Sequence, residues 1–151
     1  MDISKLLSSL NDRRVRYVLI GASAFPSHGY MRLTNDIDIL IEPTRENAQR
    51  TLDALRDVGY DVTDLTVDQV LTKKILFRQY VLATDIHPYA TGATFKTIWK
   101  NKKADTIEGV PVFVASLGDL IKMKRAANRP KDREDLKALL TLKKIQRGKK
   151  K

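Results

Sequence analysis

Apolar positions recur with a helical period near both ends of the first sixty residues. Residues 4–13 and 45–58 each gather apolar side chains on one side of a predicted helix. The inward-facing residues are Ile3, Leu6, Leu7 and Leu10 in the first helix and Ala48, Leu52 and Leu55 in the second. Thr44 is the expected N-cap of the second helix, and Gly59 is the expected end.

Two runs between these helices have the pattern of strands. VRYVLI (15–20) is short, apolar and rich in β-branched residues, and Gly21 ends it. NDIDILI (35–41) alternates polar with apolar positions, which is typical of a strand with one buried face. Residues 22–28 predict a short helical turn between the two strands.

The second half of the chain continues the alternation of helices and strands. The predicted elements are one short helix in an irregular segment 60–73, strands 74–80 and 81–87, helix 94–101, hairpin 106–114 bent at Glu108-Gly109, a helix from a cap at Ser116 to about Ala127, and helix 131–146. This order predicts an α+β fold, a mixed β-sheet flanked by helices and closed by two C-terminal helices. We find no linker or repeat, so we expect a single domain over 1–142 and a basic tail over 143–151.

Charge is distributed unevenly along the chain. Residues 1–118 contain 15 Lys and Arg against 14 Asp and Glu, whereas residues 119–151 contain 13 against 4. The last nine residues, KKIQRGKKK, carry six positive charges and no negative one. This asymmetry favours a polyanionic partner, either a nucleotide or an RNA such as tRNA, and a solubilising tail is the alternative.

Composition excludes several classes of protein. The chain has no cysteine, which removes disulfides, thiolate metal sites and a cysteine nucleophile. The first residues lack the apolar core of a signal peptide, and no apolar run approaches the roughly 20 residues that span a bilayer. We therefore expect a cytoplasmic protein without a membrane partner.

The most informative chemical feature is the pair Asp36 and Asp38. Side chains alternate along a strand, so both carboxylates project on the same side while Ile37 and Ile39 project on the other. Two such carboxylates repel each other unless a cation lies between them, and oxygen ligands suit Mg²⁺ or Mn²⁺. A solvent-exposed acidic strand face is the alternative.

A phosphate site is predicted at Gly21-Ala22-Ser23. Backbone N–H groups in a glycine turn that leads into a helix bind phosphate oxygens. Arg32 and Thr34 lie between this turn and the paired aspartates, within reach of a phosphate. Ordinary loop polarity is the alternative for these two residues.

The segment IGASAFPSHGYMRLTNDIDIL (20–40) resembles the nucleotidyltransferase superfamily, which shares the fold of DNA polymerase beta. More specifically, the chain is similar to small bacterial nucleotidyltransferase-like proteins related to toxin–antitoxin nucleotidyltransferases. The strings that carry this likeness are His28-Gly29, Arg32 to Asp38, Leu120 to Lys124 and Arg129 to Asp135. The chain departs from the pattern at Ala22, where Gly or Ser is usual, so this position offers an N–H but no hydroxyl.

The resemblance implies a third carboxylate on a neighbouring strand. Asp85 is our choice, because it lies in a predicted strand beside small residues. The rival carboxylates, all in the irregular segment, are Asp61, Asp64 and Asp68. His87 shares the face of Asp85, and we favour an outward-facing histidine over one that supports a metal ligand.

The resemblance implies transfer of a nucleoside monophosphate from an NTP such as ATP to an acceptor. Asp36, Asp38 and Asp85 would be the metal-binding and catalytic residues, with Mg²⁺ or Mn²⁺ as cofactor. Lys124 would contact the triphosphate, although a solvated basic helix with a Lys131–Asp135 pair is an equal alternative. The acceptor stays open among RNA, a protein hydroxyl and a small molecule. A different class of function is a catalytically silent module that binds nucleic acid or a partner protein, for example in a toxin–antitoxin system.

Overall fold

Six strands form one mixed sheet in the computed structural model, which describes residues 2–32 and 34–149. The strands are β1 (Tyr17–Ile20), β2 (Asp36–Ile41), β3 (Ile75–Phe77), β4 (Ala83–His87), β5 (Lys103–Ile107) and β6 (Val110–Val114). Their order across the sheet is β3-β4-β2-β1-β6-β5. The neighbours β1 and β2 are antiparallel, whereas β2 pairs with β4 and β1 with β6 in parallel. The predicted mixed sheet is therefore confirmed.

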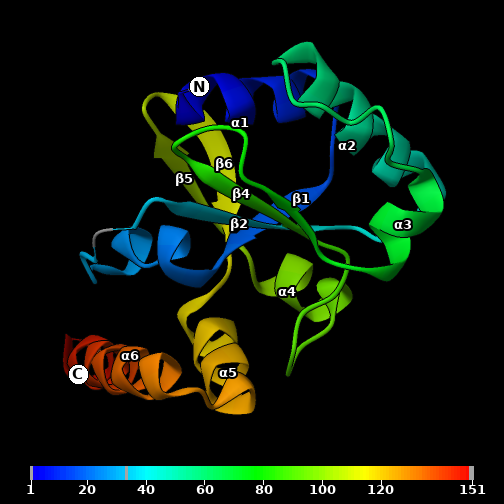
Figure 1. The fold of residues 1–151 in the computed structure, drawn as a ribbon. Coiled ribbons are helices and arrows are strands. Elements are labelled where there is room, and N and C mark those ends of the chain that lie inside the picture. Colours follow the sequence, from blue (N-terminus) through cyan, green and yellow to red (C-terminus); the bar gives the residue numbers. More distant parts are fainter. Residues whose placement is uncertain (1, 33, 150–151) are drawn as a thin grey trace.

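Helices cover both sides of this sheet. They are α1 (Ile3–Asp12), α2 (Arg45–Asp57), α3 (Val67–Thr72), α4 (Phe95–Asn101), α5 (Leu117–Ala127) and α6 (Pro130–Lys149), with two 3₁₀ turns, η1 (Gly21–Ala24) and η2 (Pro26–His28). In Figure 1, α1 and α2 lie on one side of the sheet, and α5 and α6 lie together on the other. This α+β arrangement, closed by two C-terminal helices, is the predicted fold class.

Side-chain caps begin the helices at the predicted residues. The Thr44 hydroxyl accepts a hydrogen bond from the backbone N–H of Asn47 at 3.2 Å, and Ser116 accepts one from Asp119 at 3.1 Å. Such caps satisfy N–H groups that have no partner inside the helix. The short helix α3, expected only somewhere within 60–73, begins at a capping box between Thr66 and Gln69. The T-x-x-Q spacing was the sequence signal for that start.

The core determines which face β2 presents. Ile37 and Ile39 are fully buried, together with Leu6, Leu7 and Leu10 of α1. Burial of each such side chain contributes about 1.5–3 kcal/mol, and a one-residue slip of β2 would expose both isoleucines. The register of β2 is therefore held firmly, and with it the side on which Asp36 and Asp38 project.

Some element bounds differ from the sequence expectation. Strand β5 begins at Lys103, three residues before the predicted hairpin, while the bend at Glu108-Gly109 is confirmed by φ angles of +49° and +81°. Helix α6 continues to Lys149, so residues 143–149 extend it, and Lys150 and Lys151 lie outside the described residues. The division at residue 142 stays a prediction. Within the described ranges, no helix is both long and apolar enough to cross a bilayer.

Candidate active site

Strand pairing brings Asp38 and Asp85 together. Asp38 of β2 lies directly opposite Asp85 of the parallel strand β4. Paired residues on neighbouring strands project on the same side of a sheet, so the two carboxylates share one face. The rival carboxylates lie elsewhere, and one of them, Asp68, forms an ion pair with Arg45 at 2.5 Å. The carboxylate beside Asp38 is therefore Asp85.

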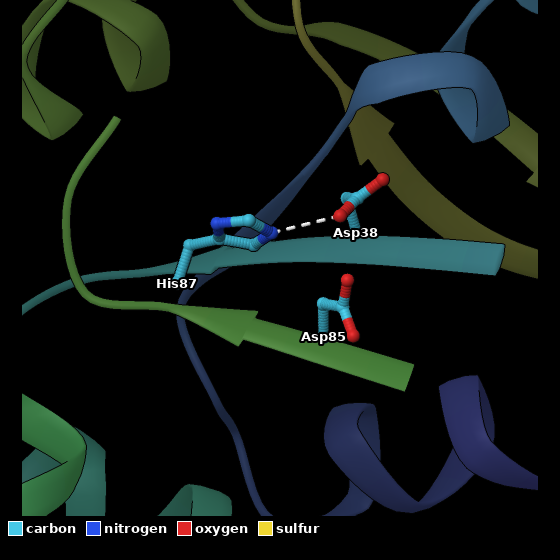
Figure 2. Close-up of side chains that lie close together, drawn as sticks. All are labelled: Asp38, Asp85 and His87. Atoms are coloured by element: carbon cyan, nitrogen blue, oxygen red, sulfur yellow. Dashed lines mark hydrogen bonds and ion pairs between the residues drawn. The ribbon is translucent and has the colours of Figure 1, made fainter. Parts of the chain in front are cut away.

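Asp38, Asp85 and His87 form a compact cluster (Figure 2). One ligand atom of each residue lies within 4.8 Å of the other two. The His87 ring contacts Asp38 through Nε2 and Oδ1 at 2.8 Å, and only 15% of its side chain is exposed. The expectation of an outward-facing His87 is therefore wrong. The ring meets the Asp38 carboxylate because of the register in which β4 pairs with β2. The alternation of side chains within β4 alone could not predict that contact.

Asp36 lies on the face that its spacing predicted, but its neighbours differ from those of Asp38. It shares the face of Asp38 but lies opposite Ala83 rather than Asp85, and it is exposed. It lines the same cavity as Asp38, outside the compact cluster with His87. The two aspartates thus differ in their surroundings, since Asp38 is half-buried against a histidine and a carboxylate.

Arg78 contacts Asp85, which we did not foresee. Its Nη1 lies 2.7 Å from Oδ1 of Asp85, and this hydrogen bond is the main reason that the pKa of the guanidinium is raised above its usual value. The negative charges of Asp36 and Asp38 act on it in the same direction. Arg78 therefore balances part of the acidic face, and its place one residue after β3 was the available sequence signal.

The glycine turn contacts the acidic cluster directly. Gly21 has a φ of +66°, and a β-carbon there would lie 2.6 Å from Oδ2 of Asp38. Ala22 lines the cavity with Gly21, whereas the Ser23 hydroxyl donates to the backbone carbonyl of Ile20 at 3.0 Å. The turn therefore presents Gly21 and Ala22 to the cavity, with Ser23 bound back onto its own strand.

A cavity of about 520 Å³ contains the cluster. Carboxylates that line it are Asp36, Asp38 and Asp85, from β2 and β4, and Asp132 of α6. Lys74 lines it just before β3, and further basic residues line it from the loop before β2 and from the α5–α6 region. The basic residues that line it there are Arg32, Lys124, Arg129 and Lys131. We call these four residues the cation wall. Thr34 also lines the cavity, and its hydroxyl accepts the backbone N–H of Asp36 at 3.1 Å.

Two buried carboxylates of α6 hold three of the four residues of the cation wall. Asp135 pairs with Arg32 at 2.7 Å and with Lys124 at 3.3 Å, in place of the Lys131 partner suggested by helix spacing. Asp132 contacts Lys124 at 3.2 Å and Arg129 at 2.6 Å. Sequence reasoning missed both aspartates as site residues, although they stand in the string that carries the family resemblance.

The environment of Asp132 lowers its pKa to about 2. Burial alone would raise this pKa, but hydrogen bonds from the side chain and backbone of Arg129 and from Lys124 favour the charged form more strongly. Asp132 therefore remains ionised although its side chain is fully buried. Within the described residues, every buried side-chain nitrogen or oxygen has a hydrogen-bond partner.

His28 has a structural role. It ends η2, and its Nε2 donates to the backbone carbonyl of Ala115 at 2.8 Å. Burial is the main reason that the pKa of this histidine is lowered, which favours the neutral ring. His28 thus ties the turn after β1 to the start of α5 and does not line the cavity.

The fold resembles those of solved nucleotidyltransferases. The lincosamide antibiotic adenylyltransferase LnuA, bound to lincomycin, has a TM-score of 0.61 and 17% identity, over 91% of this chain and 93% of that chain. ANT(2'')-Ia in complex with adenylyl-2''-tobramycin has a TM-score of 0.61 and 16% identity, over 99% and 97%. A putative nucleotidyltransferase from Thermotoga maritima has a TM-score of 0.60 and 17% identity, over 92% and 90%. At these identities the likeness concerns the fold.

Sequence comparison assigns the family. No curated protein sequence matches the chain. A family model described as a nucleotidyltransferase of unknown function (DUF6036) matches residues 1–149, almost the whole chain. With the α+β fold and the carboxylates of β2 and β4 in place, the chain belongs to the DUF6036 family of nucleotidyltransferases.

Proposed function

We propose that this protein transfers a nucleoside monophosphate from an NTP to a hydroxyl group, with the help of a divalent cation. The acceptor oxygen forms a bond to the α-phosphorus, the bond from that phosphorus to the bridging oxygen breaks, and pyrophosphate leaves. The observation that carries the proposal is that one cavity is lined by both the Asp38–Asp85–His87 cluster and the cation wall.

The residues of the cluster suit a divalent cation. Asp38 and Asp85 offer carboxylate oxygens, the preferred ligands of Mg²⁺ and Mn²⁺, and Asp36 offers a further oxygen along the same strand. His87 contacts Asp38 through Nε2, so we assign it the task of orienting that carboxylate. A cation held there would polarise the phosphoryl oxygens and neutralise part of their charge.

The glycine turn and the cation wall would bind the phosphates. Gly21 and Ala22 supply backbone N–H groups at the beginning of η1, on the cavity side. Arg32 and Lys124 supply side-chain N–H groups to the same cavity. N–H donors and cations that are already in position stabilise the charge that develops on the leaving pyrophosphate.

Asp85 is our choice for the proton acceptor of the incoming hydroxyl. It lines the cavity, and its carboxylate lies in the cluster with Asp38. A carboxylate within hydrogen-bond reach of a hydroxyl can take its proton as the bond to phosphorus forms. Arg78, on the other side of Asp85, would restrain the rotation of this carboxylate.

The positive charge at the end of α6 favours a polyanionic acceptor. RNA is a polyanion that also offers hydroxyl groups. Residues 144–149 are exposed and include Lys144, Arg147 and Lys149, with no acidic residue. A small-molecule hydroxyl is the second class, because LnuA and ANT(2'')-Ia are named in complexes with lincomycin and an adenylylated tobramycin. The experiment below separates the two classes by the size of the labelled product.

The test uses NTPs labelled at either the α- or the γ-phosphate, with Mg²⁺ or Mn²⁺ and a total-cell extract. We expect an RNA-sized product that retains the α-label, while the γ-label leaves as pyrophosphate. Retention of the γ-label would identify a phosphotransferase and contradict the proposal. A labelled product of small molecular mass would replace RNA as the acceptor and leave the transfer reaction standing.

A matched pair of variants ties the activity to the site. Asp85→Asn removes one carboxylate charge from the cavity, and Asp64→Asn removes one from an exposed position outside it. We expect labelling to be lost in the first variant and to persist in the second. If both variants label the acceptor equally well, Asp85 is not required for the transfer.

A further inference from the structure

Asp135 lies behind the cation wall rather than in it. It is 2% exposed and does not line the cavity, whereas Arg32 and Lys124 both do. A buried carboxylate requires partners, because an isolated charge away from water is strongly destabilising. The identity of those partners indicates what this residue does.

The partners of Asp135 come from two segments that are far apart in sequence. Its Oδ2 lies 2.7 Å from Nη1 of Arg32 and 3.3 Å from Nζ of Lys124. The Tyr30 hydroxyl donates to its Oδ1 at 3.4 Å. One carboxylate of α6 thus holds a cation from the loop before β2 and a cation from α5 at the same edge of the cavity.

Lys124 is restrained from further directions. Its Nζ lies 3.2 Å from Oδ1 of Asp132 and 5.4 Å from the centre of the Phe25 ring. Phe25 is fully buried, stacks on Tyr30 and directly follows η1. The position of the Lys124 ammonium is therefore linked both to α6 and to the glycine turn.

The cluster keeps a net positive charge for a ligand. Asp132 and Asp135 contribute two negative charges, and Arg32, Lys124 and Arg129 contribute three positive charges. An arginine has five N–H donors and a lysine has three, so donors remain after the contacts with the carboxylates. Ion pairing with these two carboxylates thus leaves the wall able to bind an anion.

We propose that Asp135 is a positioning residue for the triphosphate, which holds Arg32 and Lys124 toward the cavity without contacting the ligand. This inference rests on the proposed function, because it assigns the phosphates to the cation wall. Arginine and lysine side chains are long and flexible, so fixing either one costs rotamer entropy. When Asp135 restrains both beforehand, less of that entropy is lost on binding, and affinity rises.

The competing explanation is a clasp between α5 and α6 that has no effect on ligand binding. In that case, loss of the Asp135 charge would lower the free energy of unfolding and leave phosphate affinity unchanged. A positioning role requires a change in affinity in a protein that is still folded. The two explanations are therefore separated by measuring stability and affinity on the same variants.

The experiment is calorimetric titration with inorganic tripolyphosphate in the presence of Mg²⁺, since every NTP shares this group. The variants are Asp135→Asn and, as a matched control, Glu134→Gln, which removes one charge from the exposed neighbouring position of α6. We expect Asp135→Asn to weaken binding about tenfold, which corresponds to about 1.4 kcal/mol. The affinity of Glu134→Gln should stay close to that of the unmodified chain.

A double-mutant cycle with Arg32→Ala tests whether Asp135 acts through its partner. If it does, Asp135→Asn weakens binding much less once Arg32 is absent, because coupled residues are not additive. If Asp135→Asn does not fold, Asp135→Glu replaces it. That variant keeps the charge but displaces the carboxylate by one methylene, and we expect weaker binding in a folded protein.

Two results would overturn the inference in different ways. If the unmodified chain binds tripolyphosphate and the folded Asp135 variants bind it equally well, the positioning role is wrong while the phosphate site stands. If the unmodified chain binds none, the phosphate site of the proposed function is wrong, and the role of Asp135 is rejected with it.

Discussion

Gly21 and Asp38 approach each other so closely that no side chain fits between them. A β-carbon on Gly21 would lie 2.6 Å from Oδ2 and 3.2 Å from Cγ of Asp38. The antiparallel register sets Ile20 opposite Asp38, so the turn after β1 begins directly beside this carboxylate. With a φ of +66°, Gly21 also adopts a backbone conformation that other residues rarely adopt.

Gly21→Ala should therefore damage both the fold and the site. The left-handed backbone and the clash with Asp38 together should lower the free energy of unfolding by about 1–3 kcal/mol. Displacement of the carboxylate should also weaken metal-dependent binding of NTP. Gly118→Ala is the control, because Gly118 lies in α5 and its β-carbon would meet no atom within 4 Å. Denaturant unfolding checks this prediction, and equal effects of the two substitutions would contradict it.

The aspartates of the cavity should differ in their effect on metal binding. A ligand present at 100 times its Kd stabilises a protein by about 2.7 kcal/mol, so Mn²⁺ with NTP should raise the melting temperature. Asp38→Asn and Asp85→Asn should abolish this rise, since both residues belong to the compact cluster. Asp36→Asn should reduce it less, because Asp36 is exposed and lies outside that cluster.

Thermal unfolding with and without the metal and nucleotide measures these increments. Each variant is compared with itself, so a change in its intrinsic stability does not enter the result. If Asp36→Asn loses more of the rise in melting temperature than Asp85→Asn does, the metal site lies further along β2, toward the exposed end of the strand.

Gly92→Ala should push the loop after β4 away from α5, because the added β-carbon clashes with that helix. A β-carbon there would lie 2.6 Å from Cβ of Ala126 and 2.9 Å from the Lys122 carbonyl oxygen. Gly109→Ala is the matched control, because Gly109 also has a positive φ but no atom within 4 Å of the added carbon. Gly92→Ala should cost about 1–3 kcal/mol more than Gly109→Ala through overpacking.

The same substitution should also weaken NTP binding, because residues 89–91 line the cavity beside Gly92. Chemical unfolding and NTP titration of the two alanine variants check both statements. Equal stability of the two variants would show that the loop moves away from α5 without cost.

The low pKa of Asp132 predicts a loss of stability in acid. Its folded-state pKa of about 2 lies below the usual value of 3.8, so the charged form is favoured by folding. The stabilisation is complete above about pH 4 and is lost as the pH falls toward 2. The shift corresponds to about 2 kcal/mol.

Unfolding of the unmodified chain and of Asp132→Asn between pH 6 and pH 2 measures this contribution. The difference in their free energies of unfolding should shrink as the pH falls, because a growing fraction of Asp132 is then protonated and neutral, as asparagine is. A difference that stays constant over this range would show that the effect of the substitution does not come from the charge.

Removal of residues 143–151 should leave the core intact and weaken RNA binding. Residues 144–149 are exposed, and the deleted segment carries six positive charges and no negative one. Contacts of cations with phosphates release counterions, so affinity for RNA should fall and its dependence on salt should become shallower.

Filter binding to total tRNA at several salt concentrations compares the two proteins. A full-length variant with glutamine at Lys143, Lys144, Arg147 and Lys149 keeps the length of the helix and separates the effect of charge from that of length. If the affinity for tRNA depends on salt concentration with the same slope in all three proteins, the end of α6 is a solvated helix without a role in binding.

Local signals predicted most elements of this fold. The caps at Thr44 and Ser116, the bend at Glu108-Gly109 and the alternation in β2 all act within a few residues, and the structure contains each of them. Strand 74–80 was predicted too long, and β3 ends at Phe77. The next residue, Arg78, leaves the strand pattern and contacts Asp85, a partner that local propensity does not include.

The amino-acid sequence by itself determined the α+β class, the shared face of Asp36 and Asp38, and the glycine turn before them, because these follow from periods and spacings along the chain. Tertiary structure alone decided which side chains meet. It paired Asp38 with Asp85, turned His87 toward Asp38, and gave Arg32 and Lys124 their partners on α6. The reason is physical: strand register joins His87 to Asp38, 49 positions apart, and helix docking joins Arg32 to Asp135, 103 positions apart. Such contacts depend on the packing of the whole core and not on any local pattern.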